Sequence, residues 1–142
     1  MAKARDIERF RAAQDGTYPD ALAELKAGAK RGHWMWFIFP QIAGLGHSST
    51  AQFYAIAGRR EAEAYLADAV LGPRLAECTE AMLQWSGKRG AEAILGPVDT
   101  PKFRSSMTLF AEVSGGADPF AQALDSFFDG ARDEATIELL EV

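Results

Sequence analysis

The chain has 142 residues, of which 48% are hydrophobic and 25% charged, and its formal net charge is −5 at pH 7. This composition excludes a disordered or fibrous protein, and the acidic balance argues against non-specific binding to nucleic acid or anionic membranes. The length fits one globular domain, residues 1–142. We expect a cytoplasmic protein, because no signal segment opens the chain, its longest apolar run is too short to span a bilayer, and its one cysteine excludes an internal disulfide.

The first quarter of the chain predicts two short helices. Asp6 can cap the first of them, which ends at Asp15-Gly16, and the second begins at Thr17 and is closed by Gly28. Each of the two helices ends at a glycine and the connection between them is short, so an antiparallel helical pair is the simplest arrangement.

The most distinctive segment runs from His33 to Gln41 and reads HWMWFIFPQ. Its aromatic and aliphatic residues match neither the one-sided stripe of a surface helix nor the alternation of a half-exposed strand. We therefore expect the segment to be buried on all sides. Because one strand cannot form a sheet, we expect its conformation to be helical or irregular. The following Gly44–Ser49 resembles a phosphate-binding turn but lacks the lysine and spacing of a P-loop, which favours a tight turn with a serine N-cap.

The rest of the chain predicts further helices separated by short turns. Ser48 or Ser49 begins one that continues through Ile56 to Gly58, and a short helix follows from Arg59. The clearest periodicity, with spacings of four, three, four and three residues, predicts a central helix with its apolar face at Leu71, Leu75, Cys78, Met82 and Trp85. Later helices begin at Thr100-Pro101, Asp118-Pro119 and Asp133. The fold class is therefore all-α: a compact multihelical domain around a buried aromatic segment.

A polar cluster lies in the helix that begins at Thr100. If Phe103, Met107 and Phe110 face the core, Arg104 and Thr108 lie together on an adjoining face and Ser105 lies on the far side. A guanidinium, hydroxyl groups and a lysine near a helix N-terminus can recognise a carboxylate or phosphate. The predicted ligand-binding residues of this helix are Lys102, Arg104, Ser105 and Ser106. The alternative is that Arg104 makes an internal ion pair and the serines bond to the helix backbone.

The only two histidines, His33 and His47, flank the aromatic segment. Because zinc sites need three or four protein ligands, we predict no metal site. His33 is a candidate general acid or base, with a hydrogen-bonded structural histidine as the alternative. Cys78 lies on the buried face of the central helix, which predicts an inert core thiol.

Four blocks of sequence resemble the bacterial family of unknown function numbered 1810. They are His33–Gln41, then Gly44–Gly46, then Ala69–Leu75 with Glu77–Thr79, and finally Lys102 with Arg104–Phe110, and the resemblance extends from about Asp6 to Leu140. It implies a mainly helical domain and supplies no activity. Members are sometimes labelled calpastatin, but nothing in this chain explains inhibition of a calcium-dependent protease.

Two functions fit these residues. The first is a pocket for a small anionic, nucleotide-like ligand between the His33–Gln41 segment and the Arg104–Thr108 helix. In it Trp34 or Trp36 would stack on a planar ring, Gln41 would orient the ligand, and His33 and Thr108 would exchange protons. The second is a non-catalytic interaction module, with a second copy of the chain as one partner, for which an exposed Trp34 or Phe128 would be the sign. The sequence identifies no cofactor.

Overall fold

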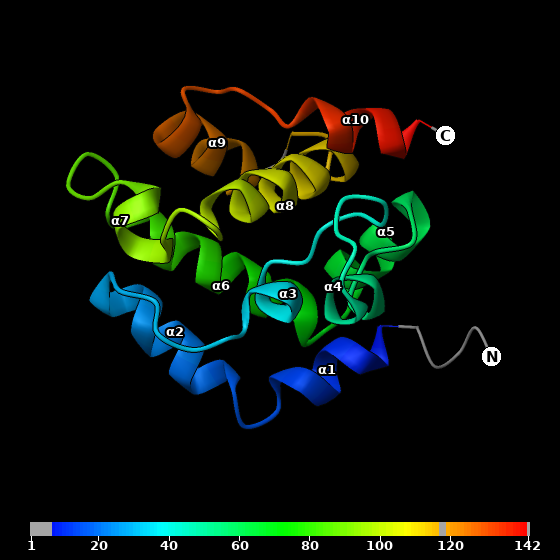
Figure 1. The fold of residues 1–142 in the computed structure, drawn as a ribbon, viewed down its shortest axis with the longest axis horizontal. Coiled ribbons are helices and arrows are strands. Elements are labelled where there is room, and N and C mark those ends of the chain that lie inside the picture. Colours follow the sequence, from blue (N-terminus) through cyan, green and yellow to red (C-terminus); the bar gives the residue numbers. More distant parts are fainter. Residues whose placement is uncertain (1–6, 117–118, 142) are drawn as a thin grey trace.

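The computed structural model describes residues 7–116 and 119–141, and Figure 1 shows these parts of the chain as a set of packed helices. Within the described residues the helices are α1 (Glu8–Gln14), α2 (Tyr18–Ala27), α3 (Met35–Ile38), α4 (Ser49–Phe53), α5 (Arg59–Ala67), α6 (Leu71–Leu83), α7 (Ala91–Leu95), α8 (Thr100–Val113), α9 (Phe120–Phe128) and α10 (Glu134–Leu140). The predicted all-α class is confirmed. None of the helices in the described ranges is long and apolar enough to cross a membrane.

Helix α8 lies at the centre of the core. Figure 1 shows it crossing the middle of the molecule, with α9 and α10 on one side and α6 on the other. Every residue from 105 to 111 is buried, which is more than one face of a surface helix would bury. The predicted core residues Phe103, Met107 and Phe110 are among the buried side chains. The neighbouring α6 buries Cys78, and this burial raises the pKa of the thiol to about 12, as an inert core residue requires.

Several predicted helix ends agree with the structure. Gly28 closes α2 in the left-handed conformation, with φ of 76°, and Ser48 caps α4 by accepting a hydrogen bond from the Ala51 N–H at 3.1 Å. The predicted caps Asp6 and Asp118 lie outside the described residues.

The prediction that the helix after Ser48 continues to Gly58 is wrong. Helix α4 ends at Phe53, and Ile56 forms an isolated parallel bridge with Ile42. The Ile56 N–H donates to the Gln41 carbonyl at 2.8 Å, and the Ile56 carbonyl accepts from the Ala43 N–H at 2.8 Å. These long-range bonds satisfy the Ile56 backbone groups in place of a further helical turn.

The aromatic segment is buried on one side only. Trp34, Met35, Ile38 and Phe39 are buried, whereas Trp36 and its neighbour Phe37 are half-buried. Because residues 35–38 form the single turn α3, positions 34, 35, 38 and 39 share one side of a helical turn and the other two positions lie at the surface. The expectation of burial on all sides is therefore corrected.

Candidate functional site

Arg104 holds the segment between α9 and α10. Its Nε donates to the Ala131 carbonyl at 2.8 Å, and its Nη2 donates to the Arg132 carbonyl at 2.8 Å. The guanidinium therefore satisfies backbone acceptors that follow the end of α9.

Ser105 and Thr108 fasten the start of α10. The Ser105 hydroxyl donates to Asp133 Oδ2 at 3.0 Å, and Thr108 Oγ1 accepts from the Asp133 N–H at 2.9 Å while donating to the Arg104 carbonyl at 2.8 Å. Ser105 is buried, so its predicted place on the far side of the helix is wrong. The carboxylate that meets this cluster is that of Asp133, the N-cap of α10.

Ser106 lies next to this cluster in sequence but has a different environment. It is fully buried, and its Oγ has no hydrogen-bond partner among the described residues. No cavity described below is lined by this side chain.

Trp34 also bonds to a carboxylate of the chain. Its side chain is 1% exposed and its indole N–H donates to Glu24 Oε1 at 2.9 Å, which also accepts from the N–H groups of Arg31 at 2.7 Å and Gly32 at 2.9 Å. Partial burial of Glu24 by itself raises the pKa of this carboxyl group. The three donors, together with the charge of Lys30, outweigh that effect and lower the pKa below its ordinary value.

Replacing Glu24 with glutamine tests this carboxylate. The glutamine oxygen has two lone pairs and can still accept from two of the three donors, so the change removes the charge and weakens the hydrogen bonding. We expect a loss of about 1 kcal/mol in the free energy of unfolding at pH 7. Because the folded-state pKa is lowered, the advantage of the wild type is present above the unfolded-state pKa and is lost as the pH falls through the folded-state pKa. Urea unfolding of both proteins at a series of pH values measures this advantage. A stability difference between wild type and Glu24→Gln that persists at low pH would contradict the lowered pKa of Glu24.

The aromatic segment and α8 meet at Trp36 and Lys102. The Lys102 Nζ lies 4.7 Å from the centroid of the Trp36 ring, which is a cation–π contact. Asp99 pairs with Lys102 at 3.3 Å and with Lys30 at 2.8 Å, so one carboxylate lies between the two ammonium groups. The aromatic segment and α8 therefore lie next to each other, as predicted, but the Asp99 carboxylate already balances part of the positive charge of Lys102 and Lys30.

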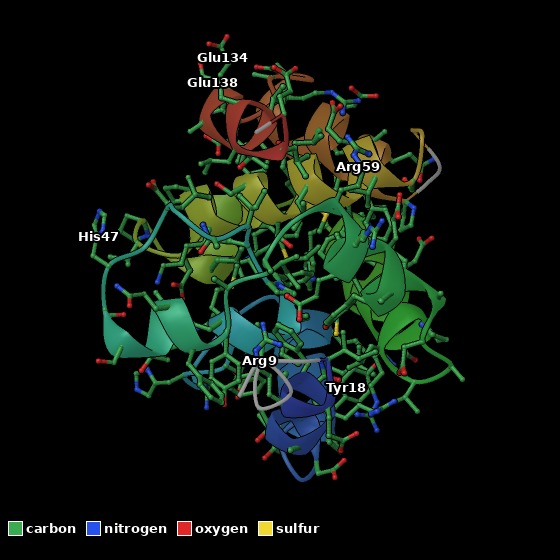
Figure 2. All side chains as sticks on the ribbon, turned by 90° about the vertical axis from the view of Figure 1, so that its right-hand side faces the viewer. Arg9, Tyr18, His47, Arg59, Glu134 and Glu138 are labelled. Atoms are coloured by element: carbon green, nitrogen blue, oxygen red, sulfur yellow. The ribbon has the colours of Figure 1, made fainter. Side chains whose placement is uncertain are left out.

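The space beside Trp36 is too small for a ligand. Trp36 and Gln41 line a cavity of about 10 Å³, which corresponds to one water molecule. His33 and His47 are both exposed, and Figure 2 shows His47 at the outer edge of the molecule, on the loop before α4. The structure therefore brings together Trp36 with Lys102 and Trp36 with Gln41, and the cavity that the described residues form at that place holds one water molecule.

A larger depression lies where α2 and α6 end. It has a volume of about 310 Å³, and we call it the Trp85 depression; its lining residues are Lys26, Gln84, Trp85 and Lys88. Figure 1 shows the ends of α2 and α6 at the left of the view, together with the loop that leads into α7. Trp85 is half-buried and the other three side chains are exposed. The volume lies at the lower end of the range for small-molecule sites.

The indole of Trp85 is held in a fixed position. Its N–H donates to the Leu25 carbonyl at 3.0 Å, and the ring lies so close to Gly28 that a Cβ atom there would come within 2.8 Å of the ring. Arg89 Nε donates to the Gly28 carbonyl at 2.8 Å. The end of α2 therefore orients both an aromatic ring and a cation beside the depression, which reduces the entropy that binding costs.

The charges of the depressions differ. The Trp85 depression is lined by two lysines and no carboxylate. A neighbouring hollow of about 370 Å³ carries two carboxylates and one guanidinium, and its lining residues are Asp20, Ala23, Glu24, Ala27, Ala29 and Arg31. An anion is therefore attracted to the first and repelled by the second.

The sequence signal for this site is the run SGKRG at positions 86–90, directly after Trp85. Two glycines around adjacent cations indicate an open basic loop, but the periodicity assigns Trp85 to the core face and the glycines to a helix break. Among the described residues no group of three or more His, Cys, Asp or Glu side chains could hold a metal ion.

Comparison with known proteins gives a family without an assigned activity. The family described as "Protein of unknown function (DUF1810)" matches residues 4–140. The crystal structure of the conserved hypothetical protein Rv1873 from Mycobacterium tuberculosis is 47% identical, with a TM-score of 0.92 over 97% of this chain and 98% of that chain. No protein with a curated description matches the chain. The match over nearly the whole length shows that this chain belongs to the DUF1810 family.

Proposed function

We propose that the protein binds a small anionic ligand with a planar ring in the Trp85 depression. The observation that carries the proposal is a hollow of about 310 Å³ that is lined by the fixed indole of Trp85 and by two exposed lysines, Lys26 and Lys88. A nucleoside monophosphate has both features that such a site recognises.

The expected affinity is modest. A pair of opposite unit charges 4 Å apart contributes about 1 kcal/mol in water and more near a protein surface, and stacking on an aromatic side chain contributes about 1–3 kcal/mol per base. Two lysines and one stacked ring together supply about 3–5 kcal/mol, which corresponds to a dissociation constant on the order of 1 mM. Salt should weaken binding, because both lysines are exposed.

The polar cluster of α8 supports a structural role instead. Arg104, Ser105 and Thr108 are bonded to the segment that precedes α10, and Trp34 is bonded to Glu24. A ligand that used these donors would have to displace groups of the chain itself. We therefore place the nucleotide-like ligand at Trp85 and not between the His33–Gln41 segment and α8.

The interaction-module alternative has less support. Trp34 is buried, and the half-buried Phe128 has its ring 6.0 Å from that of Phe103, so neither forms a flat exposed surface. In the part of the chain that the structure describes, the exposed large hydrophobic residues are Phe53, Val70 and Val98, which belong to three separate segments.

Isothermal titration calorimetry with AMP tests the proposal. We expect Lys26→Ala and Lys88→Ala each to weaken AMP binding about fivefold, because each removes one favourable charge interaction of about 1 kcal/mol. The matched control is Arg59→Ala, which makes the same change of charge at an exposed position of α5, on the opposite side of the molecule in Figure 1.

Two results would overturn the proposal. One is the absence of AMP binding at millimolar concentration. The other is an equal loss of affinity in Lys88→Ala and Arg59→Ala, which would mean that AMP senses only the overall charge of the protein.

A further inference from the structure

A second depression adjoins the first. It also has a volume of about 310 Å³, and its lining residues are Gly87, Lys88, Arg89, Gly90, Ser126 and Phe127. Lys88 lines both depressions. The Ser86 hydroxyl donates to the Ser126 hydroxyl at 3.0 Å, which ties the loop after α6 to α9 at this place.

Each depression contributes one aromatic side chain. Phe127 in the second is half-buried, and its ring is held edge-on against that of Phe103, with centroids 6.1 Å apart and planes at 70°. Trp85 in the first is held by its bond to Leu25. The two rings therefore come from α9 and from the end of α6, and both are positioned by contacts within the protein.

The cations, Lys88 and Arg89, lie on the loop that follows Trp85, and both line the second depression together with Phe127. Lys88 is exposed, and the neighbouring Arg89 is anchored through Nε to the Gly28 carbonyl at 2.8 Å and through Nη2 to the Ala93 carbonyl at 3.2 Å. These two bonds use the Nε and Nη2 groups of Arg89, so its Nη1 group and the exposed ammonium group of Lys88 are the donors that can hold the oxygens of a phosphate group.

We infer that the two depressions form one site for a ligand with two planar rings joined by a phosphate bridge, a dinucleotide in chemical class. One ring lies against Trp85, the bridge lies at Lys88 and Arg89, and the second ring lies against Phe127. This inference rests on the proposed function, because it extends the same site. Each depression alone lies at the lower end of the volume range of small-molecule sites, whereas the joined pair has room for a larger ligand.

The test compares ADP with diadenosine diphosphate, which has the same pyrophosphate but a second adenosine. We expect diadenosine diphosphate to bind about tenfold more tightly, as one further stacked base provides. Diadenosine diphosphate carries less negative charge than ADP, which by itself would weaken its binding to the lysines. Tighter binding of diadenosine diphosphate would therefore come from the second ring and not from charge.

Phe127→Leu is the matched variant, since leucine keeps an apolar side chain against Phe103 but removes the ring. We expect it to abolish the advantage of diadenosine diphosphate and to leave the affinity for ADP within about twofold. Lys88→Ala should weaken both ligands, because the bridge is common to them. The melting temperature of each variant shows whether it is folded before the titration.

The outcomes separate this inference from the proposed function. The two-ring ligand is overturned if the wild type binds ADP and diadenosine diphosphate with equal affinity, or if Phe127→Leu weakens the binding of both ligands equally. In either case the proposed function still stands if ADP binding depends on Lys26 and Lys88. If neither nucleotide binds the wild type, both fail.

Discussion

The variant Gly72→Ala is expected to lose about 3 kcal/mol of unfolding free energy. A Cβ atom at this position would lie 2.2 Å from the Leu66 carbonyl oxygen. That atom belongs to the backbone of the last turn of α5, so it cannot rotate away as a flexible side chain would. Alanine would gain about 1 kcal/mol of helix propensity over glycine, and the clash exceeds this gain. Urea denaturation of both proteins measures the difference.

The control for this prediction is Gly90→Ala. A Cβ atom at Gly90 meets nothing within 4 Å, and the backbone there has φ of −77°, which any residue adopts. This variant should unfold within about 0.5 kcal/mol of the wild type. If Gly72→Ala is as stable as Gly90→Ala, the close approach of the last turn of α5 to Gly72 is not present in solution.

The second large effect is expected at Arg9, which is labelled in Figure 2. The side chain is buried, and it donates to Glu61 at 2.8 Å and to the carbonyls of Phe53 and Ala55 at 2.7 Å each. Arg9→Met keeps most of the apolar stem but leaves these acceptors without their charged donor. Because breaking a buried ion pair typically costs about 3–5 kcal/mol, we expect a loss of about 3 kcal/mol, measured by thermal and urea unfolding.

A double variant separates the charge from the packing. In Arg9→Met with Glu61→Gln no unpaired carboxylate remains, so part of the lost stability should return relative to Arg9→Met alone. Arg59→Met, at an exposed position, should change stability by less than about 0.5 kcal/mol. An Arg9→Met protein as stable as Arg59→Met would show that the contacts of Arg9 contribute nothing to the fold.

Local signals in the sequence predicted most of the helices. The spacing of Leu71, Leu75, Cys78 and Met82 predicted α6, and Gly28 and Ser48 marked the ends at which they are found. The end of α4 could not be predicted in this way. It depends on the pairing of Ile56 with the backbone around Ile42, and such a long-range contact leaves no periodicity in the sequence.

The polar cluster of α8 shows what sequence reasoning can and cannot supply. Its donors were expected to meet a carboxylate or phosphate, and the Ser105 hydroxyl does donate to the carboxylate of Asp133. The Arg104 guanidinium donates to two backbone carbonyls instead. Since Asp133 lies 28 positions beyond Ser105, only the fold reveals that the acceptor belongs to the same chain. The same holds for Trp34, whose partner Glu24 precedes it by ten positions.

The Trp85 depression could not be predicted because it is assembled from separate segments. Lys26 comes from the last turn of α2, whereas Trp85 and Lys88 follow α6. Trp85 continues the apolar periodicity of α6, which correctly indicates that it packs against the protein. Periodicity does not reveal that the ring is only half-buried and borders a hollow.

The most direct test of the proposed site uses the three tryptophans, Trp34, Trp36 and Trp85, whose indole N–H groups give separate signals in a nitrogen–proton correlation spectrum. During titration with AMP we predict a saturable shift of the Trp85 signal, with the Trp34 and Trp36 signals unchanged. A shift of the Trp36 signal with Trp85 unchanged would place the ligand at the aromatic segment and contradict the proposed site.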